Sequence, residues 1–582
     1  MPTPPGKKYF AKHLDRCSIL RHNSSQLNIS YETFGIRIHY QKPEAEELWR
    51  IPLRAGAEGA RRFEAGQGGR QALNLSGKRT EVHNPYRADG SECTLPCSSE
   101  LLIFISSFFV VQNERIRRYR RQVEMETLLK IAQTVNLYLS DYILIIMLVG
   151  CGLYFTVKTR FVQIRCFGEG MRRVFGNFSL HGGSHHGGMS SFQALTTAIA
   201  AQVGTGNIVG ACGAILVGGP GAIFWMWIIA FFGMATIYAE AVLAQKTRQV
   251  DADGNVLGGP VCYIRTAFQG NFGKFLAGFF SVAIILALGF MGTMVQSNSI
   301  SEACQNAFGI PAWVIGLAVC AFASVIFIGG ASRVASVTEK LVPIMAVLYL
   351  IGGLIVLISR IEYLPETFGM IFKYAFVPNA IIGGGLGHAL KTAVSQGVKR
   401  GLFSNEAGMG STPHAHAMAK VETPHDQGVV AMVGVFMDTF IVLTMTALIV
   451  ISTLYAGDGI LASGAADGVE KTNMAQLAFS MIFGGTAGSA FVAVCLLFFA
   501  FSTIISWNLF GKINVVYLFG KKAALPYSVI AIAFMFLGAI LSNTLVWELT
   551  DMFNQLMVVP NVIALLALSG LVAAEANGKR KK

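Results

Sequence analysis

Long apolar stretches separated by short polar segments follow one another along the chain from Met125 onward. A helix needs about 20 mostly apolar residues to cross a bilayer, so stretches of this length predict membrane spans. Eleven spans are expected, at 141–157, 190–217, 221–245, 273–303, 311–330, 336–358, 382–412, 429–454, 487–510, 525–542 and 546–571. The pattern predicts an all-α polytopic membrane protein.

The first 124 residues do not share this pattern. They hold 20 Lys and Arg against 13 Asp and Glu, with no sustained apolar period. Leu101–Val111 is too short to span a bilayer, and Cys93 and Cys97 have no second pair nearby to complete a zinc site. Because Met125 offers a second start, we expect 1–124 to be a disordered tail or an over-extended gene start.

Composition supports the membrane interpretation. The chain of 582 residues is 53% apolar and 14% charged, whereas a soluble domain is typically about 25% charged. A soluble enzyme and a disordered scaffold are therefore excluded. The net charge of +13 divides into +7 for residues 1–124 and +6 for residues 125–582.

Basic residues in the expected loops set the orientation, because Lys and Arg of short loops stay in the cytoplasm. One set of alternate loops, with the C-terminal tail, holds 17 of them and the other set holds 3. We therefore expect the C-terminus in the cytoplasm. The positive charge of 125–582 then reflects topology, and no nucleic-acid partner is implied.

Two of the expected spans contain glycine pairs. Gly204 and Gly206 flank Thr205 at the centre of the second span, and Gly408 and Gly410 flank Met409 in the seventh. Glycine weakens a helix by about 1 kcal/mol relative to alanine, and unwound backbone at this depth is tolerated only where it lines a cavity or binds a ligand. Close helix packing is the alternative for the first pair.

The broken spans occupy matching positions. Without the first span, spans 2–6 and 7–11 form two sets of five that enter the membrane from opposite sides, and each set begins with a broken helix. This pattern is typical of an inverted-repeat secondary transporter, with the site where the breaks meet. Glu406 lies within the second break and needs a partner, since a carboxylate at this depth is costly. The candidates are freed backbone amides, Arg400 or a coupling cation; a purely structural role stays open.

Longer motifs resemble a known family. They are Gly204-Thr-Gly-Asn207, Gly218-Gly-Pro-Gly-Ala-Ile-Phe-Trp-Met-Trp227, Gly258-Gly-Pro260 and Phe403-Ser-Asn-Glu-Ala-Gly-Met-Gly-Ser411. Over about 125–575 the chain resembles the alanine/glycine:cation symporters, of the amino acid–polycation–organocation superfamily. The resemblance implies a leucine-transporter-like 5+5 inverted repeat with one extra N-terminal helix, and cotransport of alanine or glycine with sodium across a prokaryotic inner membrane.

The resemblance also implies roles for individual residues. Substrate would be bound by Thr205, Gly206, Asn207, Gln296, Phe403, Ser404, Asn405 and Trp507. Sodium would be held by Ala200, Val203, Phe499, Ser502 and Thr503. Glu406, Arg400 and Glu240 are candidates for coupling or gating, with an interfacial acid as the alternative for Glu240. Gln202 departs from the family pattern and could alter coupling.

The sequence thus predicts a sodium-coupled importer of alanine or glycine that works by alternating access, not an enzyme. Sodium is the expected coupling ion; no other metal, no cofactor and no ATP-binding subunit are expected, since no Walker motif is present. Another small neutral substrate, proton coupling, or an ion channel are the alternatives. The expected regions are an extra helix with its cytoplasmic loop (125–189), two repeats (190–360 and 361–571) and a basic cytoplasmic tail (572–582).

Overall fold

The computed structural model describes residues 27–32, 35–40, 124, 126–176, 189–250, 256–376, 386–462, 467–541 and 543–578. The chain divides into two units, Met1–Cys97 and Ser98–Lys582. In the first unit, β1 (Leu27–Glu32) and β2 (Gly35–Tyr40) pair as an antiparallel hairpin. Cys93, Cys97 and the stretch 101–111 lie outside the described residues.

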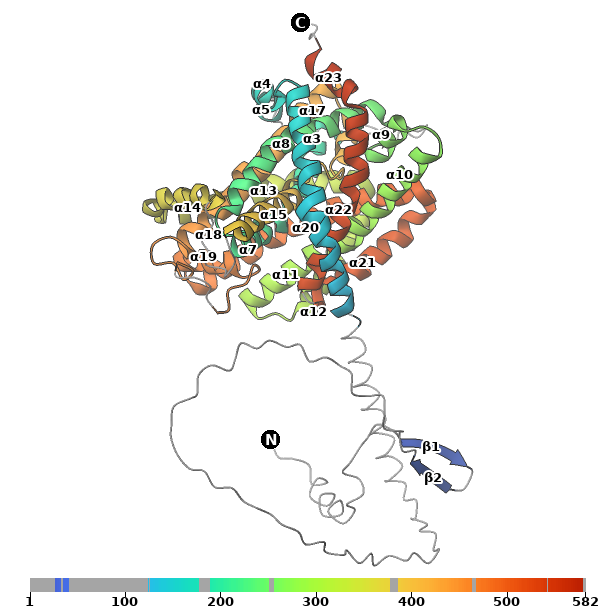
Figure 1. Cartoon of the computed structure of the whole chain (residues 1–582), viewed down its shortest axis with the longest axis vertical. Coiled ribbons are helices and arrows are strands. Elements are labelled where there is room, and N and C mark those ends of the chain that lie inside the picture. Colours follow the sequence, from blue (N-terminus) through green and yellow to red (C-terminus); the bar gives the residue numbers. More distant parts are fainter. Residues whose placement is uncertain are drawn as a thin grey trace, which may run out of the picture. The chain divides into compact units, whose positions relative to one another are not determined.

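The second unit is helical (Figure 1). Its described part begins with a helix from Glu126 to Lys158 that contains η2 (Leu139–Leu144) and α3 (Ile145–Lys158), and α4 (Val162–Arg165) and α5 (Phe167–Phe175) follow. A first group of elements follows: β3 (Met189–Ser190), α6 (Ser191–Gln202), η3 (Gly206–Gly210), α7 (Ala211–Gly218), α8 (Ala222–Thr247), β4 (Gln249–Val250), β5 (Val256–Leu257), α9 (Pro260–Ala267), α10 (Gly270–Ile284), η4 (Ile285–Gly292), α11 (Thr293–Phe308), α12 (Ala312–Ile328) and α13 (Gly330–Ser359).

A second group of elements continues to the C-terminal region. Its elements are η5 (Ile361–Tyr363), α14 (Leu364–Phe376), α15 (Leu386–Asn405), α16 (Pro413–Met418), β6 (Ala419–Lys420), α17 (Pro424–Val435), η7 (Phe436–Leu443), α18 (Thr444–Leu454), α19 (Met474–Phe483), α20 (Gly485–Phe519), η8 (Lys521–Ala523), α21 (Ala524–Ile540), α22 (Asn543–Ala567) and α23 (Ser569–Asn577).

Eight helices among the described residues are long and apolar enough to cross a membrane, and the bent pair Ser191–Gln202 and Gly206–Gly218 adds a ninth span. These nine correspond to nine of the eleven expected stretches. Of the other two, 311–330 contains the 17-residue helix α12, and 382–412 contains α15 and a non-helical segment, after which α16 begins at Pro413. Large apolar side chains such as Ile146, Phe322 and Ile328 point outward and are more than two thirds exposed, as suits a surface solvated by lipid.

The first broken helix has a clear local cause. Ser190 and Gln193 form a capping box that starts α6, and the helix ends at Gln202 because Val203 is extended, with φ −80° and ψ 90°. The chain becomes helical again at Gly206, after a bend of 45°. The break predicted from the glycine pair is therefore present.

The second break is longer. Helix α15 ends at Asn405, and the chain does not become helical again until Pro413. Glu406, Gly408 and Gly410 within it all have positive φ, which explains the two glycines. Strand β3, just before α6, pairs in parallel with β6, just after α16, and this pairing joins Met189 to Ala419. The start of the first broken helix is thereby held against the end of the second.

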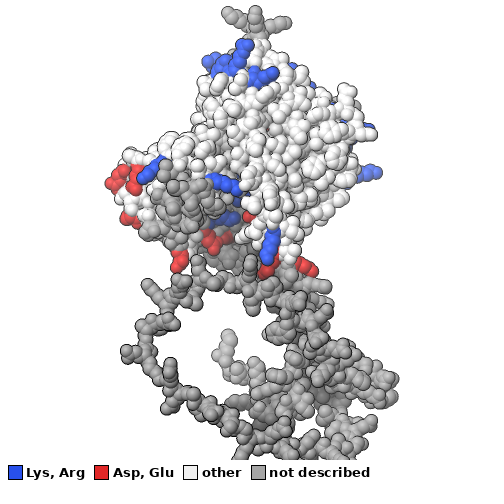
Figure 2. All heavy atoms as spheres, viewed as in Figure 1, with Lys and Arg blue, Asp and Glu red and all other residues white. Residues whose placement is uncertain are grey.

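Helices from the two halves of the unit pack on one another in pairs. Helix α8 packs on α17, α11 on α20, and α12 on α21. The extra helix α3 lies against α8 and α22, and crosses the front of the bundle beside α22 in Figure 1. Basic side chains gather at the end of the molecule where α4, α5 and α23 lie (Figure 2).

Candidate functional site

The two breaks meet at the centre of the bundle. A Cβ added to Gly206 would lie 3.0 Å from the Cα of Ser404 and 3.2 Å from the Phe403 ring, and one on Gly204 would overlap the Thr503 hydroxyl. No side chain fits at either glycine without displacing a neighbour. The backbone around the first break is therefore in direct contact with α15 at Gly206 and with α20 at Gly204.

A buried carboxylate that we did not predict lies beside this contact. Asp438 of η7 is fully buried and accepts hydrogen bonds from three side chains. Asn207 Nδ2 donates to Oδ1 at 2.6 Å, Thr439 Oγ1 to Oδ2 at 2.8 Å, and Ser404 Oγ reaches both oxygens at 3.0–3.1 Å. Asp438 therefore links the two broken helices, and places a buried carboxyl group where they meet.

Aromatic rings and one amide form the walls around this point. Gln296 Oε1 accepts from the backbone N–H of Thr205 at 3.2 Å. The Phe403 ring meets Trp507 edge-on, with centroids 5.8 Å apart, and Trp547 at 4.9 Å. Among the described residues, the buried Thr205 hydroxyl has no hydrogen-bond partner. The predicted substrate residues are thus brought together, and one polar atom among them is left unpaired.

Asn405 ends α15 at the same place. Its Nδ2 lies 3.4 Å from the Thr439 hydroxyl, and its Oδ1 accepts from the backbone N–H of Ala407 at 3.1 Å. Its carbonyl accepts from Gln202 Nε2 at 2.7 Å. Gln202, the departure from the family pattern, therefore joins the end of α6 to the end of α15.

The five residues predicted to hold sodium also form one cluster. Thr503 Oγ1 donates to the carbonyl of Ala200 at 2.9 Å and lies 3.5 Å from that of Val203. Ser502 Oγ lies 3.3 Å from the same Ala200 carbonyl, and both hydroxyls reach the carbonyl of Phe499. The cluster is all oxygen, without a carboxylate, which suits a hard cation held weakly.

Glu406 has a strained backbone and two side-chain donors. Its φ is +57°, a region that a non-glycine residue rarely adopts. Trp507 Nε1 donates to Oε1 at 2.5 Å, and Ser411 Oγ hydrogen-bonds to Oε2. Arg400 is not its partner, because the guanidinium pairs with Asp551 of α22. Glu406 therefore links the second break to α20.

Glu240 braces the same break from α8. Its carboxylate accepts from the backbone N–H of Gly408 at 3.1 Å and of Gly410 at 2.9 Å, and from Asn561 Nδ2 at 2.7 Å. Asn561 is in turn hydrogen-bonded to the hydroxyl of Tyr263. Glu240 is fully buried among these partners.

A second charge cluster lies on the other side of the breaks, along α15. Lys399 Nζ is 2.7 Å from Asp551 Oδ2, and Arg400 Nη2 is 3.0 Å from the same oxygen. The Trp547 ring lies between the Arg400 guanidinium and the Lys471 ammonium, each 4.7 Å from its centroid. These charges therefore hold together α15, α22 and the loop that carries Lys471.

The sequence interpretation missed Asp438 and Asp551. Asp438 is the one acid in the expected span 429–454, and Asp551 lies in 546–571 with Glu548 three residues before it. Acids within a span usually mark function in a membrane. That signal was available. What the sequence lacked was the proximity of Asp438 to Asn207, which is 231 positions away in the chain.

Comparisons with known proteins identify the family. The family model described as "Sodium:alanine symporter family" matches residues 125–581. The sodium/alanine symporter AgcS of Methanococcus maripaludis is 39% identical over 447 residues, which cover 76% of this chain and 96% of AgcS. The putative sodium/proton-dependent alanine carrier YrbD of Bacillus subtilis is 39% identical over 460 residues, 77% of this chain and 92% of YrbD.

Among solved structures, that of MhsT in complex with L-phenylalanine matches with a TM-score of 0.48 and 14% identity, over 68% of this chain and 97% of MhsT. The sequence matches are the decisive ones, since they extend over nearly all of the helical unit. The chain belongs to the sodium:alanine symporter family, and is a multi-pass membrane transporter of amino acids rather than an enzyme.

Proposed function

We propose that this protein imports alanine and glycine together with sodium, by alternating access. The observation that carries the proposal is the position of Asp438 between Asn207 and Ser404, next to a cluster of five oxygen-donating residues. The first broken helix contributes Asn207 to the contact with Asp438 and Ala200 to the oxygen cluster. A zwitterion and a cation could therefore bind on the same unwound segment.

The substrate would bind with its two charges at opposite sides of the break. Its ammonium group would meet the Asp438 carboxylate and the Ser404 hydroxyl. Its α-carboxylate would meet backbone N–H groups near Thr205 and Gly206, where a half-helix begins and favours an anion. The unpaired Thr205 hydroxyl is a further donor at this point. In this pose Gln296 gives up its bond to the Thr205 N–H.

Substrate size would be limited by the aromatic walls. Phe403 and Trp507 contact each other edge-on, and the Trp507 indole is fixed by its bond to Glu406. A rigid wall of this kind leaves space for hydrogen or a methyl group, which supports glycine and alanine over larger side chains.

Sodium would replace hydrogen bonds that exist inside the oxygen cluster. The hydroxyl of Thr503 now donates to the Ala200 carbonyl, and both oxygens would turn to the ion. Because Ala200 and Val203 end α6 and the substrate contacts follow directly, an ion here orders the segment that binds substrate. Each ligand then raises the affinity for the other, as linkage requires.

Opening and closing of the site would break and re-form contacts on either side of the breaks. The outer gate would consist of the ion pairs that Asp551 forms with Lys399 and Arg400. These pairs lie on the side of α15 that we assign to the exterior. Glu240 and the β3–β6 pairing would hold the inner side. The gathering of basic residues at the α4, α5 and α23 end supports a cytoplasmic C-terminus in the inner membrane.

The two sets of five spans would form the inverted repeat. Each begins with a broken helix, and three pairs of counterpart helices, α8 with α17, α11 with α20 and α12 with α21, pack together. Helix α3 would then be the extra N-terminal span.

Sodium-driven uptake of labelled alanine into proteoliposomes tests the proposal. Wild-type protein should accumulate alanine only with an inward sodium gradient, and Asp438→Asn should lose at least about tenfold in apparent affinity, because charge-assisted hydrogen bonds contribute about 1.5–3 kcal/mol each. Asp458→Asn is the matched control, since Asp458 is an exposed acid whose side chain is 80% accessible. Undiminished uptake without any ion gradient would contradict symport.

The alternatives are separable in the same vesicles. Competition by unlabelled glycine, serine and glutamine distinguishes the substrates. Uptake driven by a proton gradient in the absence of sodium would indicate proton coupling. Steady currents without any amino acid would indicate a channel.

A further inference from the structure

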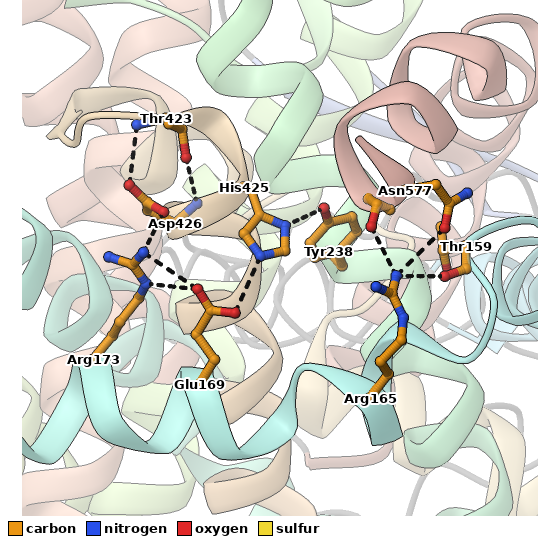
Figure 3. Close-up of polar contacts among 10 residues, drawn as sticks. Thr159, Arg165, Glu169, Arg173, Tyr238, Thr423, His425, Asp426 and Asn577 are labelled. Atoms are coloured by element: carbon orange, nitrogen blue, oxygen red, sulfur yellow. Dashed lines mark hydrogen bonds and ion pairs between the residues drawn. The ribbon is translucent and has the colours of Figure 1, made fainter. Parts of the chain in front are cut away.

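A group of soft and hard metal-binding side chains lies away from the transport site, between α5 and α17. Cys166 immediately precedes α5, Glu169 lies in the first turn of that helix, and His425 lies in the first turn of α17. A spacing of three residues places Cys166 and Glu169 on one face of α5. Figure 3 shows Glu169 and His425 pointing toward each other from the two helices.

The distances among these side chains are close to those of a bound metal. One ligand atom from each of the three residues lies within 4.8 Å of the others, and His425 Nε2 is 3.5 Å from Glu169 Oε2. Tetrahedral zinc has bonds of about 2.0–2.3 Å, which separate its ligand atoms by roughly 3.3–3.8 Å. Small side-chain rotations would therefore bring the three groups around one ion.

The histidine is already oriented for this role. The hydroxyl of Tyr238 on α8 lies 2.8 Å from His425 Nδ1. When that oxygen accepts from Nδ1–H, the lone pair of Nε2 faces Glu169. A hydrogen bond on the far nitrogen is the usual support of a metal-bound imidazole. Cys166 and His425 are buried and Glu169 is half-buried, so the site is shielded from bulk water.

The surrounding charges can accommodate a divalent cation. Glu169 and Asp426 are acidic, and Arg173 contacts both, at 3.3 and 2.7 Å. Arg165 is occupied by backbone carbonyls, with Nη2 2.7 Å from that of Ala576. The Arg173 side chain is 40% exposed, so it can turn to solvent and leave Glu169 to a metal.

We propose that Cys166, Glu169 and His425 form a binding site for zinc or a similar thiophilic divalent ion, with water at the fourth position. Binding releases the thiol proton and forms a metal–thiolate bond, with no change of oxidation state. The bound ion would link the segment that precedes the first repeat to α17, which packs on α8. The site is separate from sodium and substrate, and its existence does not depend on the proposed transport reaction.

Cobalt binding to the full-length, tag-free protein in detergent tests the proposal. Cobalt bound to a thiolate absorbs in the near ultraviolet, so a histidine-only site, such as one at His181, His185 and His186, would not produce this band. We expect the band in wild-type protein, its loss when zinc is added, and its absence in Cys166→Ser. Cys262→Ser is the matched control, because Cys262 is buried in α9 outside this group. A missing band in wild-type protein, or a band that persists in Cys166→Ser, would overturn the proposal.

The cobalt affinities of variants that keep the Cys166 thiol provide a second test. This test does not depend on whether Cys166→Ser folds. Tyr238→Phe removes the outer hydrogen bond and should weaken cobalt binding about tenfold to a hundredfold, while Glu169→Gln should weaken it at least as much. Arg173→Gln removes the competing cation and should strengthen binding. Unchanged affinity in Glu169→Gln and Tyr238→Phe would show that the thiolate binds metal elsewhere, and would equally overturn the proposal.

Discussion

Replacing Thr503 by alanine should weaken sodium binding about twofold to thirtyfold. A hydrogen bond or dipole contact to a charged group contributes about 1.5–3 kcal/mol. The same hydroxyl donates to the Ala200 carbonyl at 2.9 Å in the ion-free cluster, and giving up that neutral bond costs about 1 kcal/mol. The difference is about 0.5–2 kcal/mol, and a factor of ten corresponds to about 1.4 kcal/mol.

The assay is the sodium dependence of alanine uptake into proteoliposomes, measured at several alanine concentrations. Thr503→Ala should raise the half-saturating sodium concentration, while saturating sodium restores most of the alanine affinity. Thr503→Ser keeps the oxygen and should stay within about twofold of wild type. An unchanged sodium half-saturation in Thr503→Ala would refute the assignment of this cluster to sodium. A loss of alanine affinity that no sodium concentration reverses would refute it as well.

Three further changes test other parts of the site. Glu240→Gln should lower the melting temperature of the purified protein by several degrees, because an amide nitrogen would face the backbone donors of the second break. An unchanged melting temperature would show that Glu240 does not stabilise this break. Trp507→Phe should admit serine and larger neutral amino acids in competition assays, since it shortens the wall and frees Glu406; an unaltered competition profile would show that Trp507 does not limit size. Asp551→Asn should increase solvent access to a cysteine introduced at Phe403, measured by its labelling rate, because two cations lose their common partner; equal labelling in wild-type and variant backgrounds would exclude an outer gate here.

The local features of the site follow from short stretches of sequence. The first break could be predicted because Gly204 and Gly206 act through their own backbone conformation and through the absence of a Cβ. The second break follows from Gly408 and Gly410 for the same reason. The sodium cluster, in contrast, was predicted through family resemblance, since nothing local joins Ala200 to Thr503.

The polar contacts at the centre could not be predicted in this way. The partner of Glu406 was left open among backbone amides, Arg400 and a cation, and the structure instead places Trp507 and Ser411 there. Arg400 pairs with Asp551, at a separation of 151 residues. An ion pair or hydrogen bond carries no periodic signature along the chain, so its partner depends on which helices pack together.

By itself, the sequence determined that this protein lies in a membrane, where its helices break, and which loops carry positive charge. These properties depend on hydropathy, on glycine conformation and on the cost of moving charge across lipid, and each is a property of a short segment. Only the tertiary structure decided that Asp438 joins the two breaks, that Glu240 braces the second one, and that Cys166 approaches His425. Asp438 and Asn207 are 231 positions apart and Glu240 and Gly408 are 168 positions apart, and only the packing of α5, α8, α17 and the broken helices brings such residues together.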